Sequence, residues 1–199
     1  MKELVWYIHG QGGSAAESER YRPLFPESEV VGLDYRSAVP WEASAEIRAA
    51  AERLKNEFET VTLIANSIGA YFCMLAGIDE LVTRAYFISP IVDMERLICD
   101  MMARSGVSEA SLKEAGVFHT ASGEVLSWEY LSYAREHPVK WCAPTAILYG
   151  EADALTSFDT IKAFASESGS RLTVMMGGEH WFHTTEQLRF LDAWLCEGR

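Results

Sequence analysis

The sequence predicts an α/β protein with a doubly wound, mostly parallel sheet and a helical insertion. Short runs of β-branched and aromatic residues alternate with longer segments of helical periodicity. Most of these runs are continuously apolar, as expected of parallel strands that are covered on both faces. One central stretch has helical patterns but no convincing strand. Repeated alternation of strand and helix implies right-handed crossovers and an open parallel sheet of about six strands.

The strands and helices of this sheet can be placed along the chain. The expected strands are Leu4–His9, Val30–Leu33, Val61–Ala65, Arg84–Ile88, Thr145–Tyr149 and Arg171–Met175. The expected helices around the sheet are Glu42–Phe58, Ile68–Gly77, Thr156–Ser166 and Thr184–Cys196. In the first helix, Ile47, Leu54 and Phe58 fall on one face. In the last helix, Thr184 and Gln187 have the spacing of an N-terminal capping box.

The segment 91–141 interrupts the alternation. Helical patterns occupy Met94–Ala103, Ser108–Ala115 and Ser127–Arg135. A loop of this length is uncommon in a compact domain unless it has structure of its own. We therefore predict a helical cap insertion over residues 91–141 that covers one end of the sheet. No repeat, low-complexity tract or linker occurs, so the sequence predicts a single domain over residues 1–199.

Composition and charge exclude several classes of protein. A chain of 199 residues can bury one sizeable core, and 49% hydrophobic residues exclude a disordered or fibrous protein. The 29 acidic and 17 basic residues give a net charge of −12. Such a surface repels phosphate backbones and anionic lipids, so we expect neither nucleic acid nor a membrane as partner. The expected partner is a small molecule, and the oligomeric state does not follow from the sequence.

The sequence has no pattern of a targeting or membrane-spanning segment. The apolar run Leu4–Ile8 is too short for a signal-peptide core, and no cleavage site follows it. A run of about 18 apolar residues, which a transmembrane helix needs, is also absent. The four cysteines are far apart and form no CxxC pair: Cys73, Cys99, Cys142 and Cys196. We therefore expect reduced, mostly buried thiols and a cytoplasmic protein.

A serine follows the third predicted strand, and open parallel sheets place their sites at the carboxyl ends of strands. Ser67 joins that strand directly to a predicted helix, where a tight turn can raise its hydroxyl above the sheet. The N–H groups at the start of the helix favour a developing negative charge. The residues two before and two after this serine must be small, and Ala65 and Gly69 are. The alternative is a serine that only caps the helix.

A glycine-rich loop follows the first predicted strand, in the sequence His9-Gly10-Gln11-Gly12-Gly13. Three glycines in five positions let the backbone turn sharply and present N–H groups inward. An oxyanion pocket requires such donors. A phosphate cradle is the alternative, but the GxGxxG and GK[ST] patterns are absent, and no basic residue follows before Arg20.

An acid and a histidine follow the last two predicted strands. Asp153 can hold the imidazole of His180, and His180 can take the proton of Ser67 and later return it. A single loop aspartate is often a solvated turn residue, and a single histidine is often structural. The order Ser, Asp, His after successive parallel strands favours a catalytic triad. Glu151 is the alternative acid, and His183 is the alternative base.

Other candidate residues have weaker arguments. Surface positions are expected for His119 and His137 in the insertion, and structural roles are expected for Asp34 and Tyr35 at the end of the second strand. Several aromatic residues could line an acyl pocket or belong to the core: Trp181, Phe182, Tyr71 and Trp41. The sequence has no HExxH pattern, no Cys/His cluster and no acidic ladder, so we expect no metal and no other cofactor.

Over essentially its whole length, the chain resembles a small α/β-hydrolase. The Ser67 turn resembles the nucleophile elbow G-x-S-x-G of that family, with Ala65 in place of the first glycine. The stretches from Gly150 to Asp153 and from Gly178 to His180 resemble its acid and histidine loops. The family's first two antiparallel strands have no room, because the loop that resembles the oxyanion loop already begins at residue 9.

This resemblance assigns further residues and an activity. It implies that the amides of Gln11 and Ile68 form the oxyanion hole, with Gly12 in reserve. Independently of the resemblance, we expect Gly12, Trp181 and Tyr71 to line the substrate pocket. The resemblance also implies a carboxylesterase-like serine hydrolase that cleaves an ester or related acyl bond through an acyl-enzyme on Ser67. Two alternatives stay open. The first is a catalytically silent member of the fold that binds a small ligand or a protein partner. The second is the same triad acting on a thioester or an amide.

Overall fold

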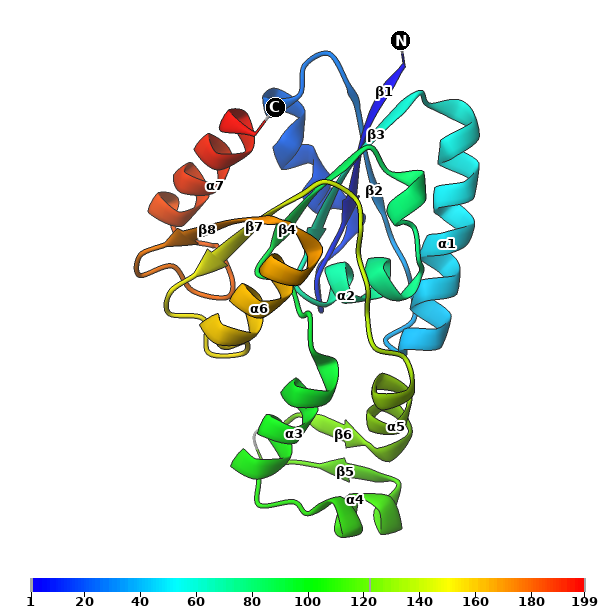
Figure 1. Ribbon diagram of the computed structural model, residues 1–199, viewed down its shortest axis with the longest axis vertical. Helices are drawn as coiled ribbons and strands as arrows, with labels where there is room; N and C mark the ends of the chain where they lie inside the picture. Colours follow the sequence, from blue (N-terminus) through cyan, green and yellow to red (C-terminus); the bar gives the residue numbers. More distant parts are fainter. Residues whose placement is uncertain (1, 122, 199) are drawn as a thin grey trace. The chain divides into compact units, whose positions relative to one another are not determined.

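The computed structural model describes residues 2–121 and 123–198 (Figure 1). The contacts between its residues divide the chain into two compact units. One unit comprises Met1–Val92 and Lys140–Arg199, and we call it the sheet unit. The other comprises Asp93–Val139, within the segment predicted as an insertion, and we call it the small unit.

The sheet unit contains a six-stranded sheet in the order β2-β1-β3-β4-β7-β8, in which all neighbouring strands are parallel. Its strands are β1 (Glu3–Ile8), β2 (Glu29–Leu33), β3 (Thr60–Asn66), β4 (Arg84–Ile88), β7 (Thr145–Gly150) and β8 (Arg171–Met175). The strand order reverses at β1, because β2 lies on one side of it and all later strands lie on the other. This order confirms the predicted doubly wound sheet. It also makes the carboxyl ends of β1 and β3 the switch point at which such sheets bind ligands.

Helices connect the strands of the sheet unit (Figure 1). They are η1 (Ala15–Leu24), α1 (Pro40–Glu57), α2 (Ile68–Leu75), η2 (Asp79–Leu81), α6 (Phe158–Ser168) and α7 (Thr185–Glu197). The capping box predicted for the last helix is present, since the Thr184 hydroxyl accepts a hydrogen bond from the Gln187 amide and the Gln187 side chain accepts one from the Thr184 amide. The two 3₁₀ helices were not predicted, because each is too short or too polar to show an apolar face.

The strands are continuously apolar because both faces of the sheet are covered. On one face, Val5 and Tyr7 of β1 belong to a buried cluster that also contains Tyr21 of η1 and Trp194 of α7. The alternate residues of β1 point to the opposite face, and they are as deeply buried: Leu4, Trp6 and Ile8. Figure 1 shows α1 and α2 side by side, away from α7. The short apolar runs in the sequence are thus strands between two helical layers.

The small unit contains three helices and a two-stranded hairpin. Its elements are α3 (Met94–Arg104), α4 (Glu109–Ala115), β5 (Val117–His119), β6 (Val125–Ser127) and α5 (Trp128–Glu136). The three helices lie where the sequence predicted them. The expectation that this segment has no strand is wrong, because β5 and β6 pair in antiparallel fashion. Each strand is only three residues long, and such a run is too short to show an alternating pattern.

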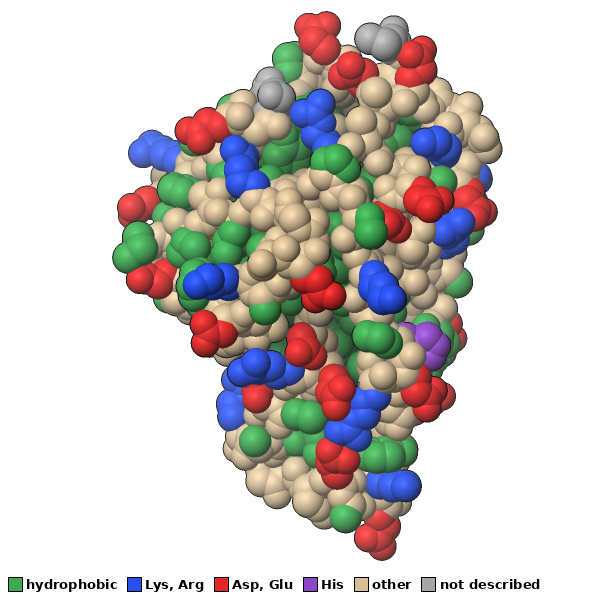
Figure 2. All heavy atoms as spheres, in the orientation of Figure 1, with side chains coloured by type: hydrophobic (Ala, Val, Ile, Leu, Met, Phe, Trp, Pro, Cys, Tyr) green, Lys and Arg blue, Asp and Glu red, His purple; other side chains and the backbone are tan. Residues whose placement is uncertain are grey.

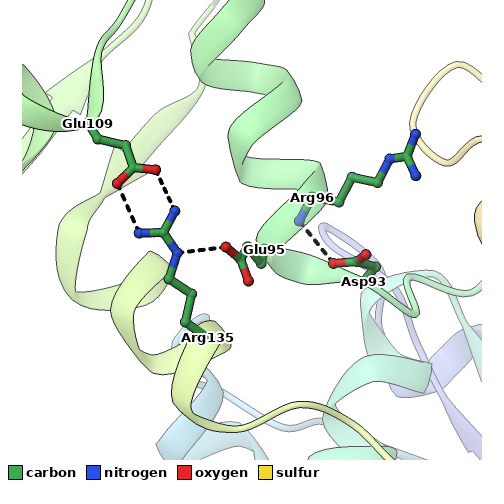
Figure 3. A network of polar contacts seen from close by, with 5 residues as sticks. All are labelled: Asp93, Glu95, Arg96, Glu109 and Arg135. Atoms are coloured by element: carbon green, nitrogen blue, oxygen red, sulfur yellow. Dashed lines mark hydrogen bonds and ion pairs between the residues drawn. The ribbon is translucent and has the colours of Figure 1, made fainter.

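One arginine connects the three helices of the small unit, as Figure 3 shows. The guanidinium of Arg135 on α5 donates hydrogen bonds to Glu95 on α3 and to Glu109 on α4. The bond with Arg135 lowers the pKa of Glu109. At the start of α3, the Asp93 carboxylate accepts a hydrogen bond from the Arg96 amide. These polar contacts lie at the surface of the small unit, beside a buried apolar core to which all three helices contribute, with Ile98 on α3, Leu112 on α4 and Leu131 on α5.

The prediction of mostly buried cysteines is wrong. Only Cys73 is buried, whereas Cys99 is half-buried, and Cys142 and Cys196 are exposed. On the face seen in Figure 2, acidic and basic side chains are interspersed rather than gathered in one patch. Among residues 2–121 and 123–198, no helix is long and apolar enough to cross a membrane.

Candidate active site

Ser67 lies in a strained turn between β3 and α2. Its backbone angles are φ 52° and ψ −121°, a region that residues other than glycine rarely occupy. The turn ends the strand and starts the helix within one residue, so the side chain lies at the sheet's carboxyl edge and remains half-buried. The structure therefore has the sharp strand–turn–helix geometry that exposes a nucleophile.

Small residues allow this turn. A Cβ atom added to Gly69 would lie 2.3 Å from the carbonyl oxygen of His9, a distance that real Cβ atoms do not adopt. A Cβ atom on Gly10 would lie 3.2 Å from the Cβ of Ser67. Ala65, which stands where the family pattern has a glycine, is completely buried in β3, and its methyl group is accommodated there. The close approach thus requires glycine after the serine, whereas alanine suffices before it.

The side chains of Ser67, His180 and Asp153 form a continuous chain of hydrogen bonds. The Ser67 Oγ lies 2.8 Å from Nε2 of His180, and Nδ1 of His180 lies 2.7 Å from Oδ2 of Asp153. An ionised carboxylate only accepts hydrogen bonds, so Nδ1 carries the proton and Nε2 is free to accept one from the serine. The imidazole is therefore oriented as a general base toward the Ser67 hydroxyl.

Asp153 is held rigidly in its loop. Its other carboxylate oxygen, Oδ1, accepts hydrogen bonds from the amides of Leu155 and Thr156 at 2.8 and 3.1 Å. The Asp153 side chain has no exposed surface, and the His180 side chain is 17% exposed. Burial raises the pKa of Tyr149, which precedes this loop, and the nearby negative charge of Asp153 adds to the effect. The carboxylate is thus buried but satisfied, and it can stabilise a positive charge on the imidazole.

The glycine-rich loop lies beside the serine. Gly10 and Gly13 close a turn through a 3.1 Å hydrogen bond from the Gly13 amide to the Gly10 carbonyl, and Gly12 within it has φ 75°. Within the described residues, we find no intramolecular acceptor for the amides of Gln11 and Ile68. Two free donors at a loop and at a helix start are what an oxyanion hole needs.

The loop is held in place by groups from outside it. The Tyr35 hydroxyl donates a 2.9 Å hydrogen bond to the carbonyl of His9, and the two rings stack. The Asp34 carboxylate accepts a 2.6 Å hydrogen bond from the Ala15 amide. These two residues were expected to be structural, and they fasten the two ends of this loop.

The alternative acid and base lie elsewhere. The Glu151 carboxylate accepts a hydrogen bond from the Gly177 amide, and Nδ1 of His183 faces the carbonyl of Trp181. Among the hydrogen bonds of the described residues, the Ser67 hydroxyl pairs with His180 and not with Glu151 or His183. His119 and His137 are exposed, as expected.

The predicted pocket residues have different surroundings. Trp181 is 70% exposed and stacks on His183, whereas Gly12 is exposed in its turn. Tyr71 is only 2% exposed and packs near Phe72, so the structure places it in the core rather than on an open surface. Its position in α2 directs it inward, together with its neighbours Ala70 to Met74.

Two residues near the site were missed at the level of sequence. Glu17 accepts hydrogen bonds from the Tyr7 hydroxyl at 2.5 Å and from the Ser14 amide at 3.3 Å, and so supports the end of the glycine-rich loop. The S-x-x-E spacing of Ser14 and Glu17 is the capping-box signal that was used for the last helix and could have identified it. Ser89 follows β4 with φ 43°. No sequence signal marks it beyond its place after a strand.

Solved structures of other proteins are similar to this chain in fold. No protein-family model matches the sequence, and no curated protein matches it. The solved structure of Est1E from Butyrivibrio proteoclasticus has a TM-score of 0.77 at 17% identity and covers 99% of this chain and 86% of its own. A putative hydrolase from Agrobacterium vitis S4 has a TM-score of 0.75 at 14% identity, covering 98% and 87%. Alpha/beta hydrolase domain-containing protein 10 from mouse has a TM-score of 0.72 at 14% identity, covering 98% and 88%.

The chain has the α/β-hydrolase fold, and the resemblance seen in the sequence is confirmed at that level. Identities this low show the fold alone, and the activity depends on the residues that this chain places at its site.

Proposed function

We propose that this protein is a serine hydrolase that cleaves an ester or a related acyl bond through an acyl-enzyme on Ser67. The observation that carries the proposal is the unbroken chain of hydrogen bonds from Asp153 through His180 to a serine in a strained turn. A serine that only capped α2 would not need this backbone, and Ser67 makes no side-chain capping bond. Serine, base and orienting acid are the parts that nucleophilic acyl transfer requires.

In the acylation step, the Ser67 oxygen attacks the carbonyl carbon while its proton passes to Nε2 of His180. The imidazole becomes positively charged, and the buried Asp153 carboxylate stabilises that charge through Nδ1. The carbonyl oxygen becomes an oxyanion, to which the amides of Gln11 and Ile68 donate hydrogen bonds. The intermediate then expels the leaving group, which takes the proton from His180, and the acyl group remains on Ser67.

In the deacylation step, His180 accepts a proton from a water molecule, and the water oxygen attacks the acyl carbon. The same two amides stabilise the second oxyanion. When the intermediate collapses, the bond to Ser67 breaks and His180 returns the proton to the serine oxygen. The acid product leaves, and the starting protonation states are restored.

The direct test is the turnover of short p-nitrophenyl esters by Ser67→Ala. We expect a loss of at least about 10³-fold in kcat, since the nucleophile is gone. Ser168→Ala is a matched control. Ser168 lies at the end of α6, where its hydroxyl bonds to Phe164 and Ser170 of the same segment, so its loss should leave kcat unchanged. Undiminished turnover by Ser67→Ala would refute the proposal.

A panel of substrates addresses the finer alternatives. Est1E has been solved with ferulic acid bound, so feruloyl esters belong in that panel beside simple alkanoyl esters, thioesters and amides. We further propose a small-molecule acyl substrate and a cytoplasmic location. The free thiols of Cys73, Cys99 and Cys142, the last of them exposed, favour a reducing compartment.

A further inference from the structure

Two serines with the same unusual backbone end neighbouring strands. In the described part of the chain, Ser67 (φ 52°) and Ser89 (φ 43°) are the only residues other than glycine with positive φ. Ser67 follows β3 and Ser89 follows β4, and these strands pair in parallel up to Asn66 and Ile88. Such a backbone persists only where the surrounding structure enforces it. The positive φ angles of both serines therefore need a structural explanation.

Both backbone groups of Ser67 bond to the segment that contains Ser89. The Ser67 amide donates a 2.9 Å hydrogen bond to the carbonyl of Ile88, and the Ser67 carbonyl accepts a 3.2 Å hydrogen bond from the amide of Ile91. We call residues 88–91 the Ser89 turn. The Ser89 amide itself donates a 2.8 Å hydrogen bond to Leu148 at the end of β7, which fixes the turn to the next strand.

The backbone of Ser89 makes this double contact possible. If β4 continued in extended form, residue 91 would lie about 10 Å beyond Ile88 and could not reach the same partner. The chain must therefore turn between residues 88 and 91. Pro90 has its own φ fixed near −65°, so the reversal occurs at Ser89.

The Ser89 side chain takes no part in holding the turn. It has no exposed surface, and its hydroxyl has no hydrogen-bond partner among the described residues. A buried hydroxyl without a partner lowers stability. What matters at this position is thus the backbone conformation and a small side chain.

We propose that Ser89 is a positioning residue whose turn holds the backbone of Ser67 in the conformation needed for attack. The inference rests on the proposed function, because it concerns the reactivity of Ser67. According to this inference, Ser89 influences the rate of the chemical step although it does not touch the substrate.

Three variants test the proposal by separating the backbone from the hydroxyl. Ser89→Gly adopts positive φ without strain, so it should raise Tm and keep kcat within about threefold. Ser89→Ala keeps the backbone and removes the unpaired hydroxyl, so its Tm should not fall and its kcat should not change. Ser89→Val has a β-branched side chain that disfavours positive φ. We expect its kcat to fall about 10- to 100-fold with KM within twofold, since small displacements of a nucleophile are costly.

A pH profile and a control variant distinguish positioning from general destabilisation. The pH profile of Ser89→Val should match that of the wild type, because the His180–Asp153 pair is untouched. Val30→Ala in the edge strand β2 removes two buried methyl groups from a strand that pairs with neither β3 nor β4, so it should lower Tm without changing kcat.

The outcomes that overturn the inference are distinct. A folded Ser89→Val enzyme with wild-type kcat would overturn it, and so would a Val30→Ala enzyme that loses kcat in proportion to Tm. If Ser89→Val does not fold, the Tm of Ser89→Gly tests the inference instead. A Tm below that of the wild type would show that the backbone of residue 89 is not strained. A wild-type protein that never reacts with an acyl substrate or a fluorophosphonate contradicts the proposed function instead.

Discussion

Replacement of Gly69 by alanine is a sharp test of how the site is built. A Cβ atom at this position would lie 2.3 Å from the His9 carbonyl oxygen and 3.0 Å from Cγ2 of Ile8. Ordinary contacts between such atoms lie near about 3.5 Å. The start of α2 and the end of β1 must therefore separate by roughly 1 Å. That movement changes the distance between the Ser67 turn and the loop that follows His9.

The expected size of the effect follows from this displacement. Overpacking of a tight contact costs about 1–3 kcal/mol, which corresponds to roughly 2–12 °C in Tm for a chain of this size. A shift of about 1 Å between the nucleophile and the Gln11 amide should reduce kcat by about 10²-fold. Both quantities can be measured, by thermal denaturation and by hydrolysis of p-nitrophenyl butyrate.

Gly169→Ala provides the matched control. Gly169 ends α6 with φ 66°, and a Cβ atom there would have no neighbour within 4 Å. Alanine in this conformation should cost about 1–2 kcal/mol and leave kcat unchanged. The reasoning is refuted if Gly69→Ala folds with the kcat of the wild type, or if Gly169→Ala loses as much activity as Gly69→Ala.

Three further predictions concern the supporting residues. Asp153→Asn should lower kcat by about 10⁴-fold with little change in Tm, because a neutral amide neither fixes the tautomer of His180 nor stabilises its positive charge; a loss below tenfold would contradict this role. Tyr35→Phe removes the hydrogen bond to the His9 carbonyl, so the unfolding free energy should fall by about 1 kcal/mol and kcat should fall several-fold. If both values are unchanged, the hydrogen bond is dispensable. Arg135→Met should speed hydrogen exchange of amides in the small unit near neutral pH. Arg135 lowers the pKa of its partner Glu109, so the ion pair stabilises the small unit while the Glu109 carboxylate is ionised. This stabilisation is lost as the pH falls through the lowered pKa. A difference in exchange rate between variant and wild type that persists in acid would contradict this prediction.

Much of the fold could be predicted because the relevant signals are local. The continuous apolar runs identified all six strands of the sheet, since a strand covered on both faces shows no alternation. Capping residues placed helix starts, as at Thr184 before α7. The hairpin of β5 and β6 was missed because strands of only three residues are too short to show a periodic pattern.

The site was predictable in its main parts because parallel strands bring their carboxyl ends to one edge. This rule is sufficient to place Ser67, Asp153 and His180 near one another from the sequence alone. The supporting contacts did not follow from it. The bond from Tyr35 to the His9 carbonyl and the approach of Ile91 to Ser67 join residues that only the three-dimensional structure brings together. The error over the cysteines has a similar cause, since composition says nothing about where Cys142 and Cys196 lie.

The most direct measurement of the central claim is mass spectrometry after reaction with a fluorophosphonate. An activated serine forms a covalent phosphonyl adduct, whereas an ordinary hydroxyl does not react. We predict one adduct per chain, located on Ser67 and lost in His180→Ala. Folded protein that remains unmodified, or that carries its adduct on another residue, would contradict the claim that these three side chains form a catalytic site.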